Sequence, residues 1–321
     1  MTQTPTPSRL AFFPVSWFAM IMGLGGLTLA WHKAETLLGL DVSFSIWIAV
    51  LASLLFVILT GVYIAKILKQ PEAVAKEWAH PVKMNFVPTF SIALILLATA
   101  WLPFSAGYSK WLWVVGAALH LVLTLFVMTQ WMHSKKFEIT HMNPAWFIPV
   151  VGNILVPIAG VNHAPDAISW FYFSIGLVFW PVLLSLVFYR ILFHGGLPER
   201  LMPTLFILIA PPAVGFIAYV KLIGGLDMLG MVLYYIGLFL TLLLFAQIGW
   251  FMRLKFFLSW WAYSFPMAAM TVATFVMYEQ TGGLLFARLA SLLLGITTVL
   301  MTGLLIRTAI AVSRREICQE D

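Results

Sequence analysis

The sequence predicts an all-α integral membrane protein. Only 9% of its 321 residues are charged, against roughly 25% in an average soluble domain. Hydrophobic residues make up 62% of the chain and the mean hydropathy is +0.98, which is more apolar surface than one water-soluble core can bury. The charges also divide the chain into apolar stretches of about 20 residues, the length of a helix that crosses the bilayer. These observations predict ten transmembrane helices in a single domain, residues 1–321.

The ten predicted spans follow one another through short connections. The first is too long for a secretory signal, and no small-residue cleavage pattern follows it. The longest connection, 69–85, leaves no room for a soluble domain, and the expected cytoplasmic tails, about 1–11 and 312–321, are short. The approximate spans are 12–31, 43–68, 86–105, 109–131, 145–163, 167–193, 203–223, 226–251, 258–278 and 284–310.

Positive charge is unevenly divided between the two sides of the predicted bundle. The side with the N-terminus and the C-terminal tail carries 14 of the 18 lysines and arginines, and the other side carries 4. Because cytoplasmic loops are enriched in Lys and Arg, both termini are expected in the cytoplasm, with the chain in the cell's inner (plasma) membrane. The same rule explains the net charge of +6 without a nucleic-acid partner.

Prolines mark all five odd-numbered spans but only one even-numbered span. Proline kinks a helix and frees backbone polar groups, which lipid does not satisfy. The odd spans are therefore expected to face inward, as five helical hairpins around a quasi-fivefold central pore, although packing alone also enriches membrane helices in proline. The predicted kinks are at Pro14, Pro88, Pro149, Pro157, Pro211, Pro212 and Pro266.

Small residues recur on one face of two odd spans. Such a stripe either lets another helix approach closely or borders open space along an axis. We expect these stripes to line a narrow pore, with the ring of Phe265 inside it; the alternative is that Phe265 simply packs or faces lipid. The predicted pore-lining residues are Ser16, Ala19, Gly23 and Gly26 on the first span, and Ala262, Ala269 and Ala273 beside Phe265 on the ninth.

Features of enzymes, metal sites and proton pumps are missing from the sequence. There is no nucleotide-binding P-loop and no zinc-protease motif, and the single cysteine, Cys318, excludes an internal disulfide. No cofactor or metal is expected. All twelve carboxylates lie in loops, at span ends or in the C-terminal tail, which argues against a proton-coupled pump. His120 is the one ionisable group deep in a span, and it either packs against a neighbouring helix or has a functional role.

The segment 260–267, Trp-Trp-Ala-Tyr-Ser-Phe-Pro-Met, resembles the most characteristic segment of the tellurite-resistance/dicarboxylate transporter family. This family includes bacterial tellurite-resistance protein A and the slow-type anion channels of plant guard cells. The resemblance implies ten helices around a pore that Phe265 blocks, and a homotrimer with one pore per subunit. Further matching residues are Leu29-Ala30-Trp31, His80-Pro81-Val82, Pro144 with Phe147-Ile148-Pro149, and Ala210-Pro211.

The expected function is a passive channel for small monovalent anions, and no enzyme activity is expected. A pore lined by small apolar residues cannot replace an anion's hydration shell, so weakly hydrated nitrate should pass more readily than chloride. The alternative is a secondary transporter or exporter of dicarboxylate, sulfite or tellurite-type oxyanions. A membrane enzyme or scaffold is a distant third. The expected partners are small inorganic or organic anions and the lipid bilayer.

Overall fold

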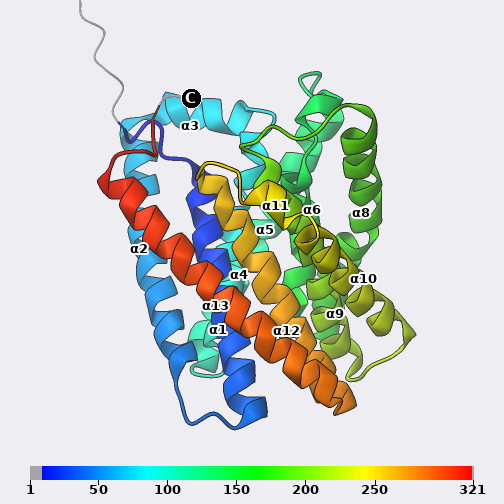
Figure 1. Ribbon diagram of the computed structural model, residues 1–321. Helices are drawn as coiled ribbons and strands as arrows, with labels where there is room; N and C mark the ends of the chain where they lie inside the picture. The colour runs from blue at the N-terminus through cyan, green and yellow to red at the C-terminus, as the bar shows by residue number, and fades with distance from the viewer. Residues whose placement is uncertain (1–8, 320–321) are drawn as a thin grey trace, which may run out of the picture.

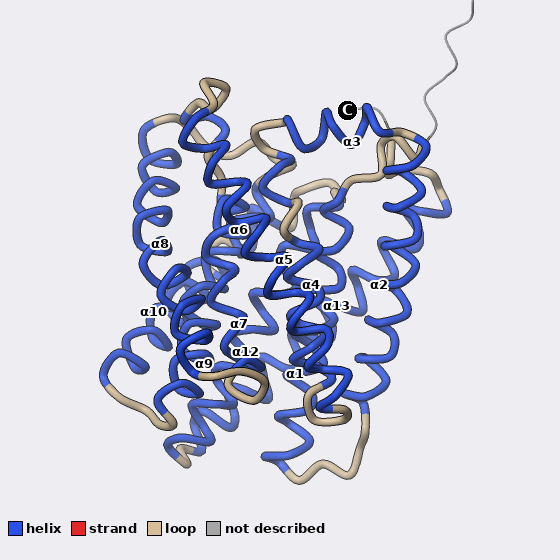
Figure 2. Tube along the Cα trace, turned by 180° about the vertical axis from the view of Figure 1, so that it is seen from behind, coloured by secondary structure: helices blue, strands red, loops and turns tan. Residues whose placement is uncertain are grey.

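Figure 1 shows a computed structural model of the chain, in which residues 9–319 are described. These residues form helices joined by loops, and none of them belongs to a β-strand (Figure 2). The ends of the two predicted tails, 1–8 and 320–321, lie outside the described residues. The described chain ends lie at one end of the bundle, where the Arg9 guanidinium donates a hydrogen bond to the carbonyl oxygen of Ile317 at 3.0 Å.

Eight helical segments within residues 9–319 are long and apolar enough to cross a membrane. Two of the ten predicted spans do not reach that measure. The fifth, Pro144–Gly160, is shorter and interrupted, and the ninth ends in the polar run Tyr278–Thr281. Ten membrane crossings therefore stay a prediction. The eight segments are Val15–Leu38, Phe44–Lys69, Lys83–Trp101, Ala106–His133, Asp166–Phe193, Met202–Ile223, Met228–Phe245 and Leu284–Ser313.

Five inner segments each begin with a 3₁₀ turn and continue as α-helix. The first two are η1 (Val15–Phe18) with α1 (Ala19–Leu38) and η2 (Lys83–Phe86) with α4 (Thr89–Trp101). The third is broken into η4 (Pro144–Trp146), α6 (Phe147–Val151), η5 (Gly152–Leu155) and α7 (Val156–Gly160). The last two are η6 (Met202–Ile209) with α9 (Ala210–Ile223) and η7 (Leu258–Tyr263) with α12 (Ser264–Thr281).

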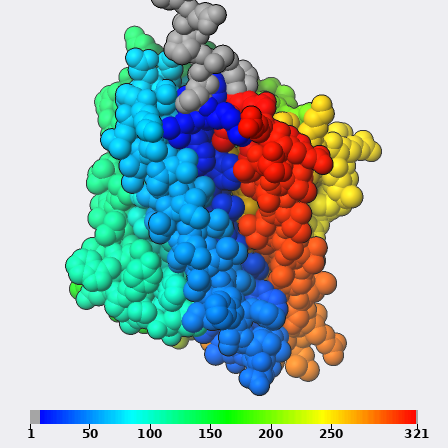
Figure 3. Space-filling view, turned by 90° about the vertical axis from the view of Figure 1, so that its left-hand side faces the viewer, coloured from blue at the N-terminus to red at the C-terminus, as the bar shows by residue number. Residues whose placement is uncertain are grey.

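Each of the five outer helices is a single α-helix, and four of them, α2 (Phe44–Lys69), α5 (Ala106–His133), α8 (Asp166–Phe193) and α13 (Leu284–Ser313), have 26–30 residues. Two short helices, α3 and α11, lie between spans, and η3 (Ile139–His141) precedes the broken segment. Figure 3 shows α2 and α13 on one outer face, with part of α1 visible between them. The fifth outer helix is α10 (Met228–Phe245). The two short helices are α3 (Pro71–Ala79) and α11 (Ile248–Phe251).

Burial separates the inner segments from the outer helices. In the three inner segments among the eight apolar spans, 72–83% of an apolar 18-residue stretch is buried, against 22–39% of such a stretch in α2, α5, α8, α10 and α13. The inner segments also contact one another in a closed order: α1 packs on α4, α4 on α7, α7 on α9, α9 on α12, and α12 on α1. Each inner segment packs in addition on the outer helix that follows it in the chain.

The seven prolines predicted as kinks lie at or near the beginnings of helical segments, whereas Pro181 lies inside the outer helix α8. A proline in the first helical turn is tolerated because its missing N–H would have no acceptor within the helix. The structure has junctions between 3₁₀ and α segments at these positions other than Pro14, and the kinks expected from the sequence stay a prediction. Pro14 precedes η1, Pro88 caps α4, and the others fall within the first three residues of an α segment: Pro149 in α6, Pro157 in α7, Pro211 and Pro212 in α9, and Pro266 in α12.

Candidate functional site

The five inner segments border a partly open cavity of about 80 Å³ near the end of the bundle where they begin. One water molecule needs about 10–15 Å³ measured in this way, so the cavity has room for several. Every inner segment contributes to the wall, and no residue of an outer helix does. The wall is made mostly by the 3₁₀ turns and the first turns of the α segments, which places the helix junctions around the cavity.

Four of the eight predicted pore-lining and gate residues lie in the cavity wall. They are Ser16, Ala19, Ala262 and Phe265. Two of the predicted prolines, Pro211 and Pro266, also line it. The pore-lining role expected for the whole set stays a prediction. The remaining predicted residues, which do not line this cavity, are Gly23, Gly26, Ala269, Ala273, Pro14, Pro88, Pro149, Pro157 and Pro212.

Gly23 and Gly26 lie where α1 and α12 approach each other closely. A Cβ atom built on Gly23 would be 2.6 Å from Cβ of Ser264, and one built on Gly26 would be 2.8 Å from Cβ of Ala268. Real Cβ atoms do not come so near to other atoms. The absence of a side chain at these two positions therefore allows the contact between the two inner helices.

Phe265 lies in the first turn of α12 and is 8% exposed. Its ring packs against the open side of Gly26, since a Cβ atom built on Gly26 would be 3.3 Å from the ring carbon Cδ2. Beyond Pro266, no residue of α12 lines the cavity. The ring thus stands where the contribution of α12 to the cavity ends, one helical turn before the buried Ala269.

The cavity wall carries no charged side chain. Its polar side chains are the hydroxyls of Ser16, Thr89 and Ser259 and the indole of Trp261, whose N–H donates to the Thr308 hydroxyl at 3.0 Å. The Thr89 hydroxyl already donates to the carbonyl oxygen of Phe86 at 2.6 Å, and the Ser259 hydroxyl donates to that of Arg200 at 2.6 Å. An ion in this cavity would therefore meet weak dipoles rather than a fixed charge.

His120 is fully buried and lies behind the wall. Its Nδ1 atom is 2.9 Å from Oγ of Ser91, and its Nε2 atom faces Gly152 without a hydrogen-bond partner among residues 9–319. Gly152 itself lines the cavity. The imidazole therefore packs between α4 and the broken third segment and does not form part of the cavity surface. Within the described residues, no group of three or more His, Cys, Asp or Glu side chains is placed to hold a metal ion.

A buried ion pair beside the cavity was missed by the sequence reasoning. The Nζ atom of Lys66 lies 2.6 Å from Oε2 of Glu77, and the two side chains are 2% and 6% exposed. The predicted second span, 43–68, contains Lys66 near its end, and the charged connection 69–85 contains Glu77. The signal available was modest: Lys66 precedes two further apolar residues, so it lies inside the last turn of α2 rather than beyond its end.

Comparison with known proteins finds that the chain is similar to plant proteins named as anion channels. It is 28% identical to the S-type anion channel SLAH3 of Arabidopsis thaliana over 307 residues, which cover 93% of this chain and 48% of that protein. It is also 28% identical to the guard cell S-type anion channel SLAC1 of the same plant, over 96% of this chain and 60% of that protein. The chain thus spans about half the length of these plant relatives.

A bacterial protein is related along most of its length. The tellurite resistance protein TehA homolog of Haemophilus influenzae is 24% identical over 271 residues, which cover 83% of this chain and 81% of that protein. The SLAC1 family, described as voltage-dependent anion channels, matches residues 12–309. This match takes in all five inner segments and confirms the family resemblance of the segment around Phe265. The chain therefore belongs to the SLAC1 family.

Proposed function

We propose that this protein is a passive channel for small monovalent anions such as nitrate and chloride. The observation that carries the proposal is the cavity, whose wall combines residues from all five inner segments and none from the outer helices. In the proposed arrangement ten helices form five hairpins in a single domain, and the ion path runs along the quasi-fivefold axis between the inner segments. Relatives named as anion channels support this assignment.

Phe265 is the proposed gate. Its ring borders the cavity at the level where α12 ceases to line it. The 3₁₀ turn η7 directly precedes α12, and Pro266 cannot donate a backbone hydrogen bond. The backbone around the ring is therefore less tightly bonded than a continuous α-helix, so the ring can move with a modest change in the first turn of α12.

The uncharged wall determines the proposed selectivity. Without Lys or Arg in the wall, the dehydration energy of each anion determines how easily it passes. Weakly hydrated anions are then favoured, and nitrate should exceed chloride. The wall also holds no Asp, Glu or His that would accept a proton during transport, which favours a passive path over proton coupling.

The proposed setting is the inner (plasma) membrane, with both termini in the cytoplasm and three subunits in the assembly. The outer helices support a lipid-facing position, since α2 exposes Trp47, Leu54 and Val57. The excess of Lys and Arg on the side of the termini supports the orientation. The trimer rests on the family resemblance, and crosslinking of the protein in native membranes tests it.

Current measurements on purified protein in a planar bilayer test the function. With potassium chloride at different concentrations on the two sides, a channel gives a current that reverses near the chloride equilibrium potential. Bilayers treated with protein-free vesicles are the control. A saturable flux that needs a proton or sodium gradient would instead indicate a secondary transporter of dicarboxylate, sulfite or tellurite-type oxyanions. The absence of any anion flux would overturn both assignments.

A further inference from the structure

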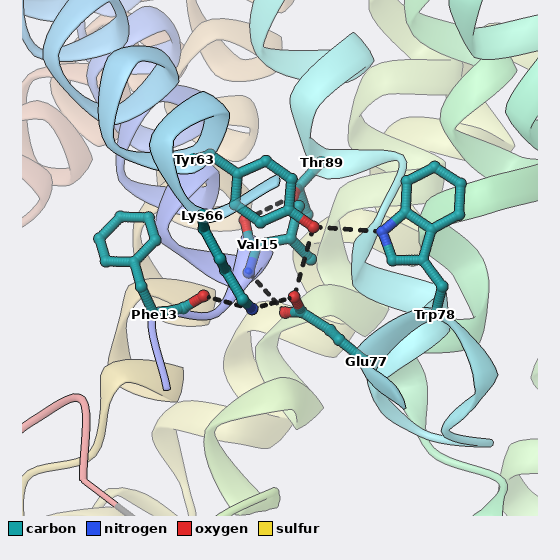
Figure 4. Close-up of polar contacts among 7 residues, drawn as sticks. All are labelled: Phe13, Val15, Tyr63, Lys66, Glu77, Trp78 and Thr89. Carbon is teal, nitrogen blue, oxygen red and sulfur yellow. Dashed lines mark hydrogen bonds and ion pairs between the residues drawn. The ribbon is translucent and has the colours of Figure 1, made fainter. Parts of the chain in front are cut away.

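The buried pair of Lys66 and Glu77 is hydrogen-bonded to the backbone on both sides of Pro14 (Figure 4). The Lys66 ammonium donates to the carbonyl oxygen of Phe13 at 2.8 Å, and the backbone N–H of Val15 donates to Oε1 of Glu77 at 2.7 Å. Val15 is the first residue of η1. Its N–H has no acceptor within the helix, and the carboxylate supplies one.

A second layer of contacts fixes the carboxylate in place. The Tyr63 hydroxyl donates to Oε2 of Glu77 at 3.3 Å, and the indole N–H of Trp78 donates to the Tyr63 oxygen at 3.1 Å. The Lys66 ammonium also lies 5.5 Å from the centre of the Tyr63 ring. These contacts tie the last turns of α2 and the short helix α3 to the start of the first inner segment.

The residues held by the pair adjoin the cavity wall. Ser16, which lines the cavity, follows Val15 directly. The carbonyl oxygen of Val15 lies 3.3 Å from the hydroxyl oxygen of Thr89, which also lines the cavity. The network thus runs from Lys66 and Glu77 through Val15 to two wall residues on different inner segments.

We propose that Lys66 and Glu77 are positioning residues that hold η1 in the wall of the ion path. The inference rests on the proposed channel function for its effect on permeation. Burying a charge is costly unless the charge is paired and hydrogen-bonded, and both side chains of this pair are buried. Here the two charges act in opposite senses on two adjacent peptide units: the cation binds a carbonyl group and the anion binds an N–H group.

This directionality separates a positioning role from a merely stabilising one. A buried ion pair replaced by apolar residues of similar size is often tolerated, whereas removal of one partner strands the other charge. The double variant Lys66→Met/Glu77→Met is therefore the informative one. The charge-swapped variant Lys66→Glu/Glu77→Lys keeps an ion pair, but its carboxylate cannot donate to the carbonyl oxygen of Phe13 and its ammonium cannot accept from the N–H of Val15.

Two measurements test the proposal on the full-length protein in lipid nanodiscs and bilayers. The first is amide hydrogen exchange of the segment 15–18. The second is the ratio of nitrate to chloride permeability, measured with the Phe265→Ala substitution added to each variant to raise the current. The matched control is Arg307→Gln/Glu316→Gln, which removes another ion pair, 2.7 Å long and more than a third exposed, whose residues do not line the cavity.

In both the Met/Met variant and the charge-swapped variant, we expect amide hydrogen exchange at 15–18 to be at least tenfold faster. The ratio of nitrate to chloride permeability should change at least twofold. Thermal stability should remain near that of the unmodified protein in at least one of the two. The control should retain both values. Unchanged hydrogen exchange in a folded Met/Met variant would overturn the proposal. So would a charge-swapped variant whose hydrogen exchange and permeability ratio both equal those of the unmodified pair. If no variant carries anion current, the channel function fails, and the hydrogen-exchange measurement alone still decides whether the pair positions η1.

Discussion

The ring of Phe265 lies against the backbone of Gly26, where a Cβ atom would approach its Cδ2 atom to 3.3 Å. The two residues belong to α12 and α1, which pack directly on each other. A glycine at this position gives the ring a flat surface on the neighbouring helix. The position of the proposed gate is thus determined by two inner helices together, and substitutions on either helix should affect it.

Replacement of Phe265 by Ala should raise anion conductance by an order of magnitude or more, because it removes the ring from the cavity wall. Chloride current per reconstituted protein measures the change. The matched control is Phe239→Ala, since Phe239 lies on the outer helix α10 and is 58% exposed; its conductance should stay at the wild-type level. A well-folded Phe265→Ala protein with wild-type conductance would show that Phe265 is not the gate.

Substitution of Gly26 by Ala should destabilise the protein by about 1–3 kcal/mol, the usual cost of an added methyl group in a packed interior. The new Cβ would lie 2.8 Å from Cβ of Ala268, so α1 and α12 must move apart. Thermal unfolding in detergent measures the loss. Gly303→Ala on α13 is the control, because a Cβ there meets no atom within 4 Å. Equal stability of the two variants would contradict the close contact.

Ion selectivity should follow the uncharged wall of the cavity. Nitrate should be more permeant than chloride, because no charge in the wall offsets the greater dehydration cost of chloride. Potassium should be poorly permeant, because no wall carboxylate attracts it and the excess of Lys and Arg on the side of the termini repels it. Reversal potentials under mixed-ion gradients measure the ratios. Equal permeability to potassium and chloride would rule out an anion-selective path.

Replacement of Thr124 by Val should cost about 1–3 kcal/mol of stability, because it removes buried hydrogen bonds to the break in the third inner segment. The Thr124 hydroxyl lies 2.6 Å from the carbonyl oxygen of Pro149 and accepts from the Asn153 amide at 3.0 Å, at the break in the third inner segment. The unfolding temperature should fall clearly. In the control Thr302→Val, an exposed hydroxyl on α13 is removed, and we expect little change. A small effect at Thr124 would mean that the broken segment does not depend on this side chain.

The α9–α10 connection should lose stability in acid through Asp227. Its pKa is lowered because the carboxylate accepts hydrogen bonds from the Gly230 N–H and, second, from the Tyr219 hydroxyl. A lowered pKa means that the charged form stabilises the fold above the ordinary pKa of about 3.9, and that this contribution disappears as the pH falls through the lowered value. The unfolding temperatures of wild type and Asp227→Asn should therefore differ at pH 7, and the difference should shrink as the pH falls below the ordinary pKa. A constant difference would contradict this role.

Much of the fold can be predicted from the sequence, since composition and periodicity reflect the environment of each segment. The first span, predicted as 12–31, is observed as Val15–Leu38, and the second, predicted as 43–68, is observed as Phe44–Lys69. The proline pattern separates the inner segments from the outer helices, because a residue that interrupts backbone hydrogen bonds needs protein neighbours. The segment around Phe265 identifies the family from a few residues.

The sequence by itself therefore determined the class of protein, the approximate spans, the inner and outer helices and the residue proposed as gate. Only the tertiary structure decided which side chains meet. It placed Gly23 and Gly26 against α12, and it paired Lys66 with Glu77 beside Val15, a residue 62 positions away from Glu77 in the chain. The physical reason is that hydropathy along a chain records a preference for lipid, protein or water, whereas the partner of a buried charge or a glycine depends on how distant segments pack.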